Sequence, residues 1–143
     1  MDYTKLAMEF LENMNTLRKA NFQKSFSDSM RGEVFILQYI SQHEGLVLPS
    51  AISHEMNISS ARITAALNNM ENKGLVTREI DKSDRRRILI QLTQAGKDLA
   101  AQHWQNHINH AIHMLSLLGE HDAQEYVRMT KKLASGIKTD IPP

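Results

Sequence analysis

The stretch Gly74–Gly96 reads GLVTREIDKSDRRRILIQLTQAG, with two apolar halves separated by a short polar segment. Residues 75–80 and 87–92 are rich in aliphatic and β-branched side chains, which is typical of strands. The polar residues 81–86 between them favour a turn, so the stretch predicts an antiparallel hairpin. Three adjacent arginines lie at this turn: Arg85, Arg86 and Arg87. Because their like charges repel one another, the sequence raises the question of which binding partner or acidic group stabilises them.

Two short helices are expected directly before the hairpin. Pro49 suits the first turn of a helix because its missing N–H would have no partner there, and Ile52 and Met56 would face inward. Ser59 is a favourable N-cap for a second helix, which should end at Gly74. Two helices joined by a short turn form a helix-turn-helix, and a hairpin after it makes a winged helix. The inward face of the second helix carries residues at helical spacing: Ile63, Leu67 and Met70.

Further helices are expected on both sides of this core. Helical spacing of apolar residues predicts helices over residues 3–20 and 29–42, with a loop or frayed helix over 21–28 and an end near Gly45. Thr93 can cap a long helix that runs to about residue 118, where Gly119 breaks it, and a last helix follows over about 121–138. The expected fold class is therefore mainly α with a small β-hairpin.

A single domain is expected over residues 1–143, with a winged helix core at about 30–95 and dimerisation helices at about 3–20 and 96–138. The first and last helices carry apolar stripes at opposite ends of the chain, and exchange with a partner chain would bury both. Packing within one chain is the alternative that the pattern leaves open. The stripe of the last helix consists of Tyr126, Met129, Leu133 and Ile137.

Composition and charge narrow the class of protein. The chain has 143 residues and no Cys, which excludes disulfides, Cys-ligated metal and thiol redox chemistry. The N-terminus lacks the pattern of a signal peptide and the apolar runs are too short to span a bilayer, so a cytoplasmic location is expected. Residues 59–87 hold seven basic and four acidic side chains, a net charge of +3 in a chain whose total is +1. This concentration indicates a local anionic partner.

The sequence resembles the MarR family of bacterial winged-helix transcription regulators over nearly its whole length. The most specific features are the turn DKSDRR, which resembles the family's Asp, two spacers and Asp-Arg-Arg, and the following LTQAG, which resembles its Leu-Thr-x-x-Gly. The segment LPSAISHEMNISSARITAALNNMENKGLV fits the family's helix-turn-helix spacing. The resemblance implies a homodimer on a pseudo-palindromic DNA operator, usually a repressor that an effector releases.

The exposed side of the second helix and the hairpin turn are the candidate DNA contacts. A recognition helix reads base edges in the major groove, and Arg62 and Asn68 could make bidentate contacts there. The resemblance makes Arg86 the choice for a minor-groove contact at the tip, while Arg85 could pair with Asp81 or Asp84, or contact a phosphate. A solvated helix face and a charged edge that blocks strand pairing are the alternatives. The candidate DNA-binding residues are Ser59, Ser60, Ala61, Arg62, Thr64, Ala65, Asn68, Lys82, Arg85 and Arg86.

Other kinds of site have weaker support in the sequence. No Gly-rich phosphate loop or catalytic Ser/His/Asp pattern is present, so we expect neither an enzyme nor a cofactor. His103 and His107 have the i, i+4 spacing of a metal-binding pair, but two ligands fall short of a zinc set, so no metal is expected. Zinc-responsive family members draw a further His from the second helix, where this chain has Val34 after Glu33. The alternative functions are a winged-helix protein-interaction module and a zinc-responsive regulator of the same family. For the preferred function, a DNA-binding repressor, the expected effector is a small molecule that the sequence does not identify.

Overall fold

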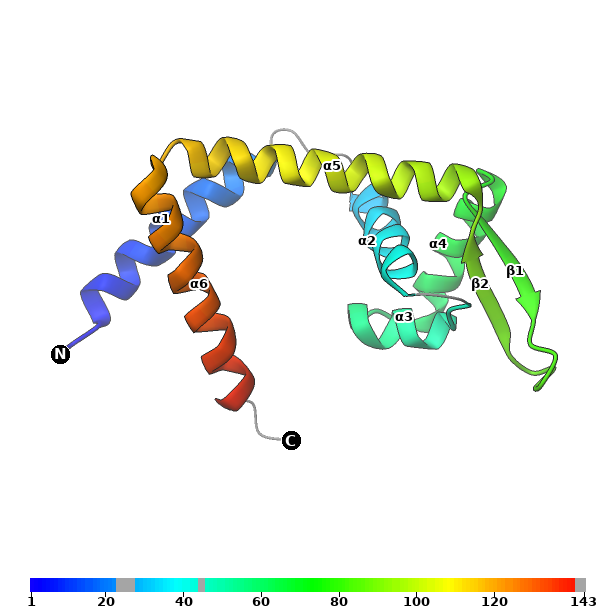
Figure 1. The fold of residues 1–143 in the computed structure, drawn as a ribbon. Coiled ribbons are helices and arrows are strands. Elements are labelled where there is room, and N and C mark those ends of the chain that lie inside the picture. The colour runs from blue at the N-terminus through cyan, green and yellow to red at the C-terminus, as the bar shows by residue number, and fades with distance from the viewer. Residues whose placement is uncertain (23–27, 44–45, 141–143) are drawn as a thin grey trace. The chain divides into compact units, whose positions relative to one another are not determined.

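A computed structural model describes residues 1–22, 28–43 and 46–140. The residues group into two compact units, Met1–Ala100 and Ala101–Pro143. Six helices and two strands occur in the described residues (Figure 1): α1 (Thr4–Phe22), α2 (Asp28–Gln42), α3 (Pro49–Met56), α4 (Ser60–Asn72), β1 (Val76–Ile80), β2 (Ile88–Leu92), α5 (Gln94–Ser116) and α6 (Glu120–Asp140). The expected class, mainly helical with one hairpin, is confirmed.

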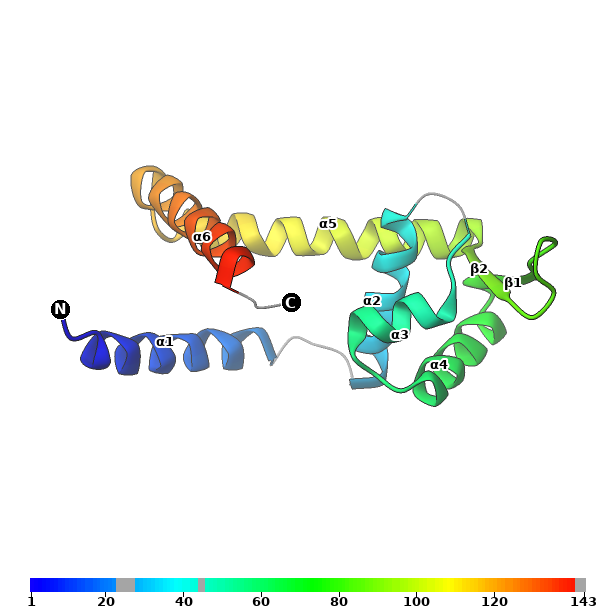
Figure 2. The same ribbon diagram turned by 90° about the horizontal axis from the view of Figure 1, so that it is seen from below.

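The hydrophobic core of the first unit lies where α2, α3, α4 and the hairpin meet. In the view of Figure 2, α3 crosses α2, and α4 follows α3 after a short turn. The inward faces predicted for α3 and α4 are confirmed, except that Met56 is only half-buried. On α2 the most buried aliphatic residue is Ile36, while Val34 is half-buried. The core residues are Ile36, Leu37, Ile40, Val47, Ile52, Ile63, Leu67, Met70, Val76, Ile90 and Ala100.

The turn between α3 and α4 is built by local backbone chemistry. Pro49 is the first residue of α3, and Asn57 ends that helix in the left-handed conformation at φ 52°. Asn tolerates this conformation better than most residues because its short polar side chain bonds locally. The Ser53 hydroxyl donates to the Ile58 carbonyl over 2.5 Å. Ser59 then caps α4 by accepting from the backbone N–H of Arg62 over 3.3 Å, as the sequence predicts.

The hairpin is antiparallel, with Val76 opposite Leu92 and Ile80 opposite Ile88. Val47 forms an isolated antiparallel bridge to Ile90, donating to its carbonyl over 2.9 Å and accepting from its N–H over 2.7 Å. No pattern in the sequence indicated this bridge. It ties the segment before α3 to the strand that leads into α5.

The Leu-Thr-x-x-Gly segment fastens the start of α5 to the start of the hairpin. The Thr93 hydroxyl accepts from the backbone N–H of Gly96 over 3.1 Å, which makes Thr93 the expected cap, and it donates to the Gly74 carbonyl over 2.6 Å. A Cβ atom on Gly96 would lie 2.1 Å from the carbonyl oxygen of Leu75. Glycine is therefore required here because the helix and the backbone before β1 approach each other so closely.

The remaining helices carry apolar side chains that the chain itself leaves exposed. Helix α1 begins at Thr4, one residue later than expected, and extends through Asn21 and Phe22; of the expected loop, residues 23–27 lie outside the described residues, as does Gly45. Gly119 separates α5 from α6 at φ 78°, as expected. In the described part of the chain, no helix combines the length and apolar content that a membrane span needs. The exposed apolar residues of these three helices include Leu6, Phe10, Leu11, Met14, Leu17, Trp104, Ile112, Tyr126, Val127, Met129, Leu133 and Ile137.

Candidate nucleic-acid interface

One side of α4 is buried in the core and the other side is exposed. The buried side carries Ile63, Leu67 and Met70, so the residues between them turn outward. The exposed side combines small residues, which permit close approach of the backbone, with side chains that form hydrogen bonds. All seven sequence-predicted residues of this region are exposed, and together they form the α4 face: Ser59, Ser60, Ala61, Arg62, Thr64, Ala65 and Asn68.

Two hydroxyl groups of the α4 face already serve the helix itself. The Ser59 oxygen accepts from the Arg62 backbone, and the Thr64 hydroxyl donates to the Ser60 carbonyl over 2.9 Å. Thr64 has therefore used its single hydrogen, and it can only accept from a further partner. In contrast, the guanidinium of Arg62 forms no hydrogen bond or ion pair with any described residue. Arg62 is the cation of α4 that remains available for a ligand.

An arginine that sequence reasoning did not select connects the hairpin to the α4 face. The guanidinium of Arg78, on β1, donates from its Nη2 to the side-chain oxygen of Asn68. Its Nε lies 3.4 Å from Glu71 Oε2 of α4, an ion pair without hydrogen-bond geometry. Arg78 shares a strand face with the buried Val76, and this alternation is the signal that could have identified it.

The turn of the hairpin is fixed by its two aspartates. Asp81 accepts from the backbone N–H and the hydroxyl of Ser83, over 2.9 and 2.7 Å, and these hydrogen bonds lower the pKa of Asp81 below its ordinary value. Asp84 accepts from the backbone N–H of Arg86 over 3.1 Å, and the turn closes through a bond from Arg87 N–H to the Asp84 carbonyl over 2.9 Å. Both carboxylates therefore shape the turn.

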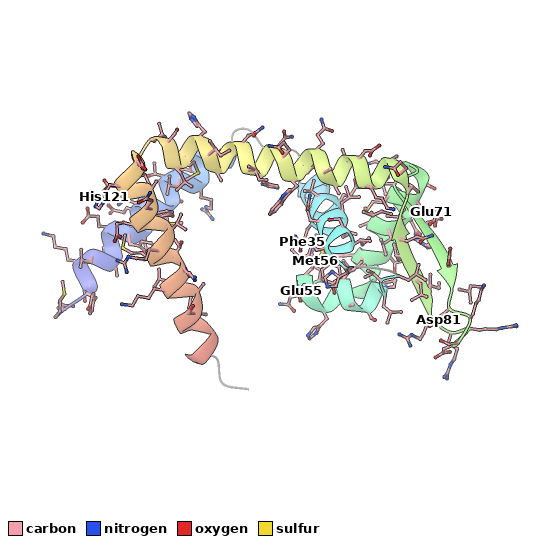
Figure 3. All side chains as sticks on the ribbon, in the orientation of Figure 1. Phe35, Glu55, Met56, Glu71, Asp81 and His121 are labelled. Atoms are coloured by element: carbon pink, nitrogen blue, oxygen red, sulfur yellow. The ribbon has the colours of Figure 1, made fainter. Side chains whose placement is uncertain are left out.

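The three arginines differ in their surroundings. Arg86 Nε lies 3.2 Å from Asp84 Oδ1 although its side chain is 92% exposed, and Arg87 Nε lies 3.8 Å from Asp81 Oδ2. The ion pairs that were considered for Arg85 are thus made by Arg86 and Arg87, because the tight turn brings those two side chains next to the carboxylates. Arg85 has no ion-pair partner among the described residues. Figure 3 labels Asp81 at this turn, from which long side chains extend outward.

A buried carboxylate joins α4 to α2. Glu33 is 8% exposed and accepts from Asn69 Nδ2 over 2.5 Å and from Lys73 Nζ over 2.8 Å. Glu33 precedes Ile36 and Leu37 by three and four residues, so it lies on the buried stripe of its helix, which is the signal that could have revealed its role. Its carboxylate is occupied by Asn69 and Lys73, so it is not free to hold a metal ion.

The histidines of the long helix show no metal centre. Burial lowers the pKa of His103 below its ordinary value, and the neighbouring His107 lowers it further. His43, directly after α2, lies against Tyr39, with its Nδ1 2.6 Å from that residue's carbonyl oxygen. In the part of the chain that the structure describes, no three His, Cys, Asp or Glu side chains are grouped to hold an ion. Whether His103 and His107 bind zinc weakly stays a prediction.

Comparison with known proteins identifies similar transcription regulators. The model of the MarR family matches residues 30–87, which run from α2 through the hairpin turn. The uncharacterized HTH-type transcriptional regulator YwhA of Bacillus subtilis is 28% identical over 126 residues, which are 88% of this chain and 88% of that protein. The family model therefore covers the helix-turn-helix and most of the hairpin, whereas the match to YwhA extends over most of the chain.

Several solved structures share the fold. The YusO protein of Bacillus subtilis superposes with a TM-score of 0.73 at 22% identity, covering 94% of this chain and 99% of that one. FabT of Streptococcus pneumoniae, solved in complex with DNA, gives 0.70 at 23% identity over 96% of both chains. MepR, a transcription regulator of the Staphylococcus aureus multidrug efflux pump MepA, gives 0.70 at 19% identity, covering 96% and 99%. The winged helix architecture expected from the sequence is thus confirmed.

Proposed function

We propose that this chain, which matches the MarR family model over residues 30–87 and is 28% identical to YwhA, is a DNA-binding transcriptional regulator of that family and acts as a homodimeric repressor on a pseudo-palindromic operator. Each subunit places α4 in a major groove and the hairpin turn in the neighbouring minor groove. The candidate DNA contacts are the residues of the α4 face together with Lys82, Arg85 and Arg86 of the turn.

The observation that carries this proposal is the pairing of an exposed polar helix face with an exposed cationic turn in one packed unit. Helix α4 is held to the hairpin by Arg78 and to α2 by Glu33, so its orientation relative to the turn is fixed by both. A helix held in a fixed orientation can contact base edges in the major groove. An exposed Arg is attracted by the negative potential of a narrow minor groove. The DNA complex of FabT supports the same use of this fold.

The uncovered apolar side chains of α1, α5 and α6 support a dimer. A monomer in water would expose aromatic and aliphatic residues such as Phe10, Trp104 and Leu133, at a cost of about 25 cal/mol per Å² of apolar area. A second copy of the chain offers the same surfaces, and closed two-fold dimers are the commonest protein assembly. Two-fold symmetry also presents two recognition helices to the two halves of a palindrome.

Regulation by an effector completes the proposal. We propose that the protein represses transcription until a small effector releases it, as the resemblance to the family implies, and that it acts in the bacterial cytoplasm, where a DNA partner would lie. No chemistry among the described residues selects a particular effector molecule. A screen of the dimer against metal ions and aromatic acids by thermal shift, with operator release as a second readout, identifies it, because a ligand stabilises the state it binds.

The test of the DNA-binding proposal is selection from a pool of randomised duplexes, followed by hydroxyl-radical footprinting on the selected site. We expect an enriched palindromic motif, two chains per duplex by sedimentation, and protection of two minor-groove segments placed symmetrically about the centre. An Arg86→Ala variant should lose the minor-groove protection. Absence of any enriched motif, with weak binding that ignores salt, would instead favour the winged helix as a protein-interaction module.

A further inference from the structure

The hydrogen bond between Arg78 and Asn68 determines how the Asn68 amide is turned. A guanidinium has only N–H donors and no acceptor, so the atom of Asn68 that faces it must be the amide oxygen. The oxygen Oδ1 is therefore engaged by Arg78. The other end of the amide, Nδ2, has two N–H donors and belongs to an exposed residue of the α4 face.

Arg78 is itself held in place by its neighbours. The carboxylate of Glu71, one helical turn beyond Asn68, lies 3.4 Å from the Arg78 Nε. The side chain of Arg78 is 26% exposed, and its strand pairs with β2 opposite Ile90, a core residue. The guanidinium thus connects a fixed strand to two positions of α4, and this contact orders the Asn68 side chain before any ligand arrives.

We propose that Arg78 is a positioning residue that fixes Asn68 as a hydrogen-bond donor, so that Asn68 selects a base edge that presents an acceptor. This inference rests on the proposed binding of α4 in the major groove. Free asparagine pairs with adenine in two bonds, because its oxygen accepts from N6 while its nitrogen donates to N7. Arg78 occupies one of the two lone pairs of that oxygen and holds the amide in one orientation, so we expect the donor end to read a base acceptor: purine N7, guanine O6 or thymine O4. This proposal narrows the sequence-based expectation of a bidentate contact at Asn68, which stays a prediction.

The competing role for Arg78 is a direct contact with a DNA phosphate. Such a contact adds affinity on every sequence and contributes to the salt dependence, with a slope of about −0.9 per phosphate neutralised. A positioning role acts through Asn68 alone and changes base preference at one position of each half-site. These two roles make different predictions for the same variants.

The experiment compares the wild type, Arg78→Met, Asn68→Ala and the double variant on a duplex pool and then on single-base variants of the selected site. The wild type is expected to discriminate among the four base pairs at one position by about ten-fold, the scale of a good specific contact. Arg78→Met should reduce that discrimination several-fold, or shift it toward adenine, with affinity for random duplex unchanged. In the Asn68→Ala background, Arg78→Met should change the base preference no further.

Each other outcome has a defined meaning. If Arg78→Met lowers affinity equally for operator and random duplex and reduces the salt slope by about one phosphate, Arg78 contacts the backbone and the inference is wrong. It is also wrong if the two substitutions act independently. If Arg78→Met does not fold, Glu71→Gln is tested instead, because it removes the carboxylate beside Arg78. This variant should also discriminate less between base pairs. An unchanged base preference in Glu71→Gln overturns the inference. A wild type that enriches no motif refutes the proposed function itself.

Discussion

Gly96→Ala should destabilise the winged helix because the new methyl group has no room. Its Cβ would lie 2.1 Å from the Leu75 carbonyl oxygen, a backbone atom that cannot rotate away. Relief requires α5 to move from the start of β1, which breaks the bond from Thr93 N–H to that carbonyl (3.0 Å) and strains the bond from the Thr93 hydroxyl to Gly74 (2.6 Å). Each bond is worth about 1 kcal/mol and overpacking about 1–3 kcal/mol, against about 1 kcal/mol gained by alanine in a helix. The expected net loss is thus about 2–4 kcal/mol, the sum of these effects.

Urea unfolding followed by circular dichroism measures this loss. Wild type and variant are compared at one chain concentration, because the stability of a dimer depends on concentration. Gly32→Ala in α2 is the matched control, because a Cβ atom at Gly32 would have no other atom of the chain within 4 Å. We expect this variant to be neutral or stabilising by up to about 1 kcal/mol. If Gly96→Ala proved as stable as the wild type, the close approach of α5 to the backbone before β1 would not be needed for the fold.

Three further predictions concern readout, assembly and metal. Arg62→Ala should relax sequence preference more than it lowers affinity for random duplex, because base contacts specify and phosphate contacts position; equal losses measured by fluorescence anisotropy would argue against base readout. Deletion of residues 1–20 should give an aggregated or unfolded chain in sedimentation, since the exposed apolar residues of α6 lose their proposed cover; a folded monomer would overturn the shared core. Zinc titration should show only weak binding without an effect on DNA affinity, because His103 and His107 supply two ligands of the four that structural zinc prefers. Tight stoichiometric binding that alters operator affinity, and that His103→Ala/His107→Ala abolishes, would show a zinc sensor.

The helix-turn-helix was predictable because its determinants are local. Ser59 caps α4 through a bond three residues away, and Ile63, Leu67 and Met70 fall on one face by helical spacing alone. The hairpin was predictable for the same reason, because its two strands are adjacent in sequence. Local patterns of this kind depend little on where the rest of the chain packs.

The features that the sequence did not reveal depend on contacts between distant segments. The Val47–Ile90 bridge joins residues far apart in the chain, and nothing near Val47 marks a strand. Glu33 and Arg78 are charged residues in otherwise apolar patterns, so a reading based on polarity places them in solvent. Their partners Asn69 and Asn68 lie on a helix that packs against both.

The roles of the three arginines at the hairpin turn also could not be predicted from the sequence, although the residues are adjacent. Their charge indicated an anionic partner, but which of them pairs with Asp81 or Asp84 depends on the dihedral angles of the turn. The structure assigns these pairs to Arg86 and Arg87 and leaves Arg85 without one among the described residues. Composition therefore indicated the kind of surface, and only the folded turn determined the role of each side chain.

The most direct test of the account is the operator affinity of Arg86→Ala, measured by fluorescence anisotropy beside Arg128→Ala. Both variants remove one positive charge, but Arg128 lies on α6 and pairs with Glu125, while Arg86 lies at the tip of the hairpin. We expect Arg86→Ala to weaken operator binding by about 1–3 kcal/mol without loss of folding, and Arg128→Ala to change it by less than about 0.5 kcal/mol. Equal affinities for the two variants at moderate salt would contradict the proposal that the hairpin turn enters the DNA.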